Sequence, residues 1–142
     1  VKSPEMLPID SRLRARAREI SRFHDTRLEP LLRGCFAHVA LSTRDPEIVL
    51  TNLNLLATRL GQLALMVAPS PLLFGDELTI TDCGFVPTFA LMKTLSGVFD
   101  FDLGLPQKLV DYENALTAHP SVKDHNMAYY AALDAWVASR LA

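Results

Sequence analysis

The hydrophobic residues of this chain recur at steps of three and four, the spacing of one face of an α-helix. The first such stretch covers residues 11–34, and its expected core face consists of Leu13, Ala17, Ile20, His24, Leu28 and Leu31. Asp10 or Ser11 can cap its start. Pro30 lacks a backbone N–H and should bend the helix, while the apolar residues 35–41 favour a helical continuation.

A second helix is expected over residues 46–67. Asp45-Pro46 provides a capping carboxylate followed by a proline at the first helical position. The apolar stripe contains Val49, Leu53, Leu56, Leu60, Leu63 and Val67, widened by Leu50, Ala57 and Ala64. No apolar run approaches the about 18 residues that a membrane-spanning helix needs, so we expect no membrane span.

A third helix, over residues 80–95, is predicted to start at a variant of the capping box. The Asp82 carboxylate can accept from the Thr79 amide, and the Thr79 hydroxyl can accept from the Asp82 amide. Pro87 should bend this helix.

Two more helices follow a turn-rich connection over residues 97–104. Pro106 starts a short one, which His119-Pro120 ends because a residue before proline disfavours the helical conformation. Residues 121–124 form a second capping signal ahead of the last helix. Since no stretch shows the alternation of a strand, the sequence predicts an all-α fold with about five main helices.

Composition narrows the class of protein. The 142 residues suit one domain, and with 49% hydrophobic residues the chain can bury a core. The net charge of −2 gives no reason to expect nucleic-acid binding. Cys35, Cys83 and four scattered histidines match no metal-ligand spacing, so no metal site is expected. Two unrelated cysteines and a polar N-terminus without a signal peptide favour a cytoplasmic location.

Three segments in this order resemble the C-terminal domain of cytosolic, bacterial-type glutathione transferases. Residues 75–83, with Pro87 downstream, resemble the capping-box motif of that domain. Residues 109–122 are similar to its next helix and the His-Pro-Ser-Val ending of that helix. Residues 7–16 resemble the linker and the first helix.

The resemblance implies a linker remnant at residues 1–9 and a helical domain at 10–142. In that family a preceding thioredoxin-like domain carries the catalytic Ser, Tyr or Cys, and none of its patterns is found in this sequence. No catalytic residue can therefore be carried over, and we expect the chain alone to show no glutathione transfer. The parent protein would conjugate its co-substrate glutathione to a hydrophobic electrophile. This domain would supply the apolar side of the cleft.

The resemblance also implies partners. The missing thioredoxin-like domain is one, and a second copy of the chain is another. We expect a homodimer whose contact uses the helices at 11–41 and 46–67. The alternative hypothesis is a non-catalytic module for protein interactions, which would need no pocket for the glutathione thiol.

Four residues are the candidates for the cleft. Arg22 and Glu29 lie at positions that resemble those from which some bacterial members contact glutathione. Arg33 and Phe36 lie where the family builds its electrophile pocket. The alternatives are a solvated charged face for the three charged residues and core packing for Phe36.

Several other residues are better explained by packing than by chemistry. We expect Cys35 to be a small buried hydrophobic residue rather than a nucleophile. We expect His24 to be a histidine of the core whose ring is hydrogen-bonded. Phe89, Met92 and Trp136 have the helical spacing of core residues.

Overall fold

The computed structural model describes residues 6–142 and contains no β-strand within them. Its helices are α1 (Ser11–Phe23), α2 (Glu29–Gly34), α3 (Pro46–Met66), α4 (Ile80–Phe99), α5 (Gln107–Ala118) and α6 (Pro120–Leu141). A π-helical turn, η1 (His24–Leu28), joins α1 to α2 without a break. Counting α1 and α2 as one gives five main helices, and the predicted all-α class is confirmed.

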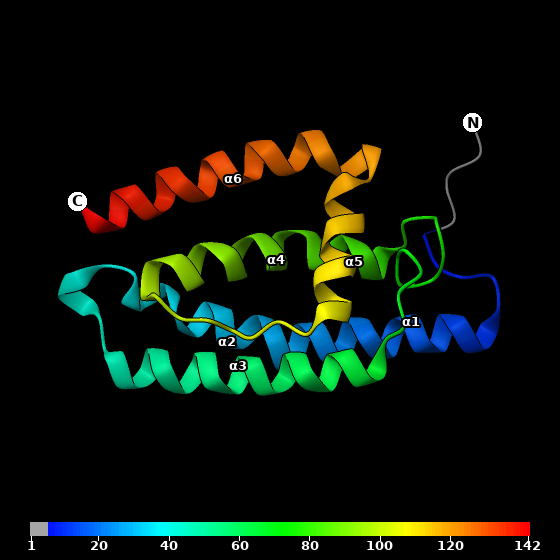
Figure 1. Cartoon of the computed structure of the whole chain (residues 1–142), viewed down its shortest axis with the longest axis horizontal. Coiled ribbons are helices and arrows are strands. Elements are labelled where there is room, and N and C mark those ends of the chain that lie inside the picture. The colour runs from blue at the N-terminus through cyan, green and yellow to red at the C-terminus, as the bar shows by residue number, and fades with distance from the viewer. Residues whose placement is uncertain (1–5) are drawn as a thin grey trace.

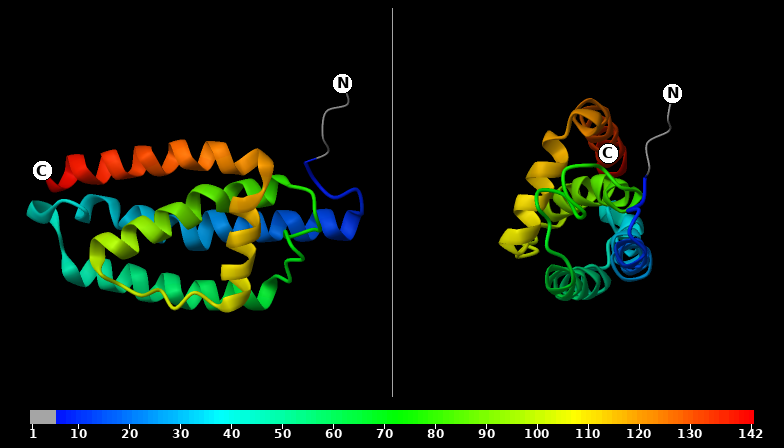
Figure 2. Two further views of the ribbon diagram at one scale, coloured as in Figure 1. Left: turned by 45° about the horizontal axis from the view of Figure 1, so that its top comes forward. Right: turned by 90° about the vertical axis from the view of Figure 1, so that its right-hand side faces the viewer.

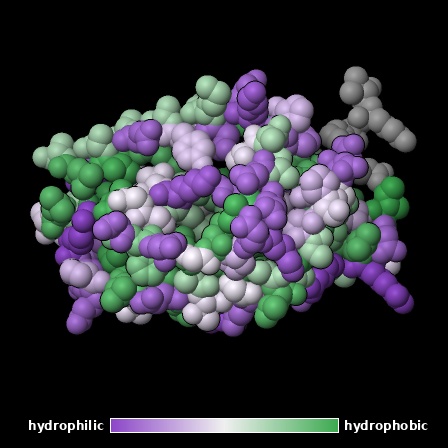
Figure 3. Space-filling view, in the orientation of Figure 1, coloured by the Kyte–Doolittle hydropathy of each residue, from purple (hydrophilic) through white to green (hydrophobic). Residues whose placement is uncertain are grey.

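Helix α4 lies at the centre of the domain. Seen end-on, α6 and α3 lie on opposite sides of it, while α5 and the α1–α2 helix cover its two flanks (Figure 2). α5 crosses the bundle steeply, whereas α3, α4 and α6 run along its length (Figure 1). The largest side chains of the core are aromatic: Phe85, Phe89 and Tyr112 lie with their ring centroids 5.8–6.0 Å apart. On the face seen in Figure 3, polar and apolar side chains are interspersed.

A buried carboxylate starts the central helix. Thr79 and Asp82 form a capping box, in which Asp82 Oδ2 accepts from the Thr79 amide at 2.9 Å and from the Thr79 hydroxyl at 2.7 Å. Asp82 Oδ1 accepts from the Leu73 amide at 3.2 Å and from the Tyr112 hydroxyl at 2.8 Å. Since Asp82 has no exposed surface, these bonds replace the water that the charge would otherwise bind.

Two more contacts tie this helix start to the N-terminal part of the chain. The Thr81 hydroxyl donates to the Ala17 carbonyl at 3.2 Å, and the Ser21 hydroxyl donates to Thr81 Oγ1 at the same distance. The Ile80 amide, free at the start of the helix, donates to the Met6 carbonyl at 2.8 Å. Met6 therefore lies beside the first turn of α4, whereas residues 1–5 of the expected linker lie outside the described part.

The last turn of α3 is completed by side chains from elsewhere in the chain. Lys108 Nζ donates to the carbonyls of Ala64, at 2.8 Å, and Val67, at 3.1 Å. The Arg16 guanidinium donates to the Met66 carbonyl. Cations at the carbonyl end of a helix satisfy its unpaired acceptors and its negative dipole.

α3 is also apolar. Within residues 6–142 it is the helix that is long and apolar enough to cross a membrane by length and composition. The sequence pattern predicted no such segment. One helix of this kind is weak evidence of a membrane span; 33% of its most apolar stretch is buried inside the bundle, where Leu53, Leu56 and Leu60 pack.

The first predicted core stripe is wrong at Leu13, and at its other end Leu31 is only partly buried against the core. Leu13 is 48% exposed, because the start of α1 extends past the end of the bundle (Figure 1). At the other end Leu32, not Leu31, is fully buried. The wide η1 turn adds a residue to the helical repeat and shifts the buried face by one position. The irregularity expected at Pro30 thus lies in the preceding turn.

Other predicted boundaries are also corrected. Residues 35–41 do not continue the first helix; after Gly34 only short 3-10 turns follow, at Phe36–His38 and Leu41–Thr43. α4 runs beyond residue 95 to Phe99 and ends at Asp100, whose left-handed backbone, at φ 50°, stops it. Residues 121–124 do not cap α6.

The actual cap of α6 is His119. Its Nδ1 accepts from the Ser121 amide at 3.2 Å, and Pro120 occupies the first helical position. The proline ends α5 and starts α6 within two residues, which makes the sharp corner between them (Figure 1).

Replacing Asp82 by Ala tests how far the fold depends on this carboxylate. Asp82→Ala leaves buried donors of Leu73, Thr79 and Tyr112 unpaired, and we expect the free energy of unfolding to fall by about 3–5 kcal/mol. Tyr112→Phe, the control, keeps the ring and removes one hydrogen bond to a charged group, so it should cost about 1.5–3 kcal/mol. Urea unfolding followed by circular dichroism measures both. Equal losses in the two variants would contradict this account.

Candidate ligand cleft

A pocket of about 280 Å³ lies where the end of α2 approaches α4 and α6. Its lining is mostly aromatic and aliphatic: Arg33, Phe36, Leu91, Tyr129, Leu133 and Trp136. We call it the Trp136 pocket. The Phe36 and Trp136 rings lie 5.2 Å apart between centroids, and the Arg33 guanidinium carbon lies 5.8 Å from the Phe36 centroid. Such a site can hold a planar apolar group beside a cation.

Local structure explains how these side chains meet. Gly34 ends α2, and the following 3-10 turn places Phe36 against α6. Tyr129, Leu133 and Trp136 are spaced by four and three residues, so they share one face of α6. The pocket therefore depends on how α6 crosses the bundle, and residues about 100 positions apart in sequence form its two walls.

Charge in the Trp136 pocket comes from one ion pair. Glu29 Oε1 accepts from Arg33 Nε one helical turn away, and the Arg33 side chain remains largely exposed. Burial raises the pKa of Tyr129, and the nearby Arg33 charge partly offsets that rise. Arg33 is thus held by Glu29 yet has donors left for an anionic or electron-withdrawing substituent on a bound molecule.

The four predicted cleft residues separate in the structure. Arg33 and Phe36 line the pocket, and Glu29 joins its edge through Arg33. Arg22 is exposed on α1 and lines no described pocket. Their roles toward a ligand remain predictions.

The α6 side of this pocket was not predicted from the sequence. Trp136, assigned to the core, is only half-buried and lines the pocket, whereas Phe89 and Met92 are core residues as predicted. The i, i+4, i+7 spacing of Tyr129, Leu133 and Trp136 was visible in the sequence. Nothing in it showed that these residues face Phe36 rather than the interior.

His24 joins a carboxylate and a hydroxyl in a line. Its Nδ1 lies 2.7 Å from Asp25 Oδ1 and its Nε2 lies 2.7 Å from Thr88 Oγ1. The order resembles that of a catalytic triad, but Thr88 is buried and its hydroxyl donates to the Gly84 carbonyl at 3.1 Å. His24 also packs edge-on against Phe85. The arrangement therefore fixes η1 to α4, the role of a core histidine.

Neither cysteine is activated. Burial raises the pKa of the Cys35 thiol to about 11, and its Sγ donates to the Leu31 carbonyl at 3.4 Å. Cys83 is exposed overall, but partial desolvation of its thiol and the nearby Asp82 charge raise its pKa. Both thiols are therefore protonated at neutral pH, whereas the nucleophilic form of a cysteine is the thiolate. Within residues 6–142 no group of three or more His, Cys, Asp or Glu side chains could hold a metal ion.

Thiol titration separates the two cysteines. At pH 8, we expect Ellman's reagent to modify Cys83 in the native protein, while Cys35 reacts only as fast as the protein unfolds. Cys83→Ser should abolish the early phase, and Cys35→Ser should leave it unchanged. An early phase that persists in Cys83→Ser would show that Cys35 is accessible and reactive.

Comparison with known proteins supports the fold. No model of a known protein family matches the sequence, and no curated protein matches it. The chain is similar in structure to a Tau-class glutathione S-transferase from mango, Mangifera indica L., with a TM-score of 0.73 and 17% sequence identity. The match covers 94% of this chain and 63% of that one. The chain therefore has a glutathione-transferase-like helical fold, and it spans less than two thirds of its neighbour.

Proposed function

We propose that this chain is the helical part of a glutathione-transferase-like protein and that the Trp136 pocket receives a hydrophobic electrophile. The observation that carries the proposal is the mostly apolar pocket at Arg33 and Phe36, on a fold similar to a glutathione S-transferase. A planar electrophile would lie against the Phe36 and Trp136 rings. Arg33 would attract an electron-withdrawing substituent on it.

Glutathione itself would be held by a second, thioredoxin-like domain of the parent protein. That domain would lower the pKa of the glutathione thiol, and the thiolate would attack the electrophile and displace its leaving group. This chain contributes the apolar wall. The bacterial type suggested by the sequence and a cytoplasmic location remain predictions.

We also propose that the protein forms a homodimer through α1 and α3. On α3, Ile48 is 44% exposed and Leu55 is 39% exposed. These residues are seven positions apart and so share one side of the helix. Apolar side chains placed in a row on a surface favour association.

A non-catalytic module for protein interactions is the second candidate function. Its support is that the likeness to a glutathione S-transferase is one of fold, at 17% sequence identity, and that the pKa values of Cys35 and Cys83 are both raised. Retention of a longer natural form on glutathione–agarose, with turnover of a dinitrohalobenzene, would exclude it. The 142-residue chain itself should show no turnover.

Trp136 is the single tryptophan of the chain, so its fluorescence reports on the pocket. We expect 1,3-dinitrobenzene, an electron-poor ring without a leaving group, to quench it saturably. Phe36→Ala should weaken that binding about tenfold, because it removes one aromatic wall. Phe101→Ala is the matched control, because Phe101 lines a different pocket, beside the start of α3. Quenching that is linear, or equal in both variants, would disprove binding at this pocket.

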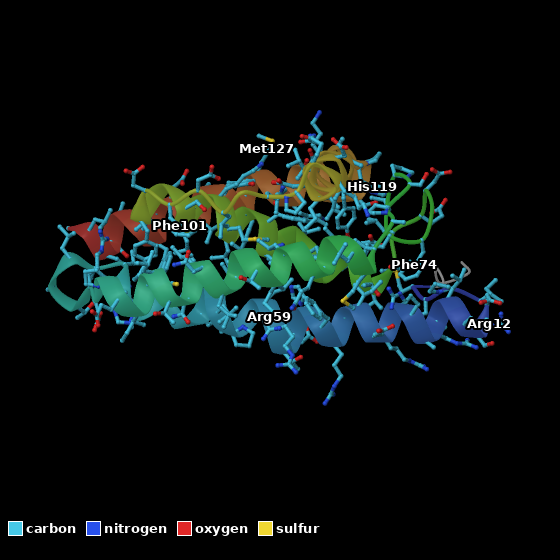
Figure 4. All side chains as sticks on the ribbon, turned by 60° about the horizontal axis from the view of Figure 1, so that its bottom comes forward. Arg12, Arg59, Phe74, Phe101, His119 and Met127 are labelled. Carbon is cyan, nitrogen blue, oxygen red and sulfur yellow. The ribbon has the colours of Figure 1, made fainter. Side chains whose placement is uncertain are left out.

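The dimer is tested by sedimentation velocity. We expect the wild-type chain to form dimers at micromolar concentration and the double variant Ile48→Asp, Leu55→Asp to be monomeric, because two charges oppose an apolar contact. Met127→Asp is the control, since Met127 is 69% exposed and points away from the bundle on α6 (Figure 4). A wild-type chain that stays monomeric at high concentration would overturn the proposal.

A further inference from the structure

A second and larger pocket opens where the first half of α6 passes over the start of α4. Its volume is about 620 Å³, within the range of small-molecule sites. Its walls are mainly apolar, formed by Met6, Leu78, Val86, Pro87 and Val122. We call it the α4–α6 pocket. It meets the Trp136 pocket at Tyr129, which lines both.

A buried amide with an unpaired oxygen lines this pocket. Asn126 is only 6% exposed, and its Oδ1 has no hydrogen-bond partner among residues 6–142. Leaving a buried polar atom unpaired costs about 1–3 kcal/mol, so such an atom calls for an explanation. A primary amide presents a donor and an acceptor side by side. Its natural complement is another group that carries both.

The charges around the α4–α6 pocket favour a neutral ligand. Neither Lys nor Arg lines it, and Glu77 is its one carboxylate. The other titratable groups in its lining are Cys83, His119, His125 and Tyr129, and His119 Nδ1 is already engaged in capping α6. A carboxylate or phosphate would find no cation to balance its charge on entering an apolar site.

We propose that the α4–α6 pocket binds a small neutral molecule with an apolar body and a carboxamide group that pairs with the Asn126 amide. The apolar body contacts Val86, Pro87 and Val122. Because Asn126 Oδ1 has almost no accessible surface, the side-chain amide turns about its last torsion to face the ligand, and Oδ1 then accepts from the carboxamide N–H. The binding is non-covalent, and it does not depend on the proposed electrophile site.

Benzamide is the probe, followed by NMR chemical shifts of the 142-residue chain. We expect saturable shifts at Val86, Val122 and Tyr129. Methyl benzoate, which has a similar ring and a carbonyl but no N–H, should bind about tenfold more weakly, the loss expected for one buried hydrogen bond. Equal affinity for the two probes, or no saturation at millimolar concentration, would overturn the proposal.

Variants separate recognition from stability. Asn126→Leu should weaken benzamide binding about tenfold, while the matched exposed substitution Asn114→Leu should not change it. Asn126→Leu should not lower the melting temperature, because it removes an unpaired buried group. A lower melting temperature together with unchanged benzamide affinity would assign Asn126 to structure alone and refute its role in binding.

A comparison with a longer form of the protein shows whether the carboxamide comes from a separate small molecule or from the protein itself. A longer form of the protein that no longer binds benzamide, although the 142-residue chain does, would support the same chemistry supplied by the protein's own residues. Binding by both forms would support an external small molecule.

Discussion

Asp82 joins the start of α4 to the loop before it and to α5, which lies 30 positions further along the chain. Donors from the loop before α4, from the cap residue and from α5 meet on one carboxylate that water does not reach. A buried charge is stable only while its partners are in place. The start of the central helix, the path of the loop and the position of Tyr112 are therefore fixed together. Burial and Asp82 both raise the pKa of Tyr112, which keeps its hydroxyl as a donor.

The helix starts were the most predictable features. Asp10, Asp45 and Asp82 each accept from amides within three positions, so neighbouring residues suffice to foresee them. The ends were less predictable. A short apolar run after Gly34 resembles a continuing helix, and nothing local shows that Asp100 rather than a glycine stops α4. Tertiary packing decides such boundaries.

The candidate cleft was predictable on one side only. Arg33 and Phe36 came from a family resemblance, and they do lie together in the structure. Their partner wall on α6 depends on the sharp corner at Pro120, which sets the direction of α6 across the bundle. A helical period identifies which residues share a face, but it does not identify what that face meets. The unpaired Asn126 amide is likewise a property of packing and leaves no trace in composition.

The end of α3 has a consequence for how the domain assembles. Arg16 lies 50 positions before the carbonyl that it binds, and Lys108 lies 41 and 44 positions after its own two. A piece of the chain that begins after Arg16 or ends before Lys108 lacks one of the two cations, so it cannot complete that helix end. α1 and α5 are thereby linked through one set of carbonyl groups. Loosening either helix loosens the same turn, which favours cooperative unfolding of the domain over fraying helix by helix.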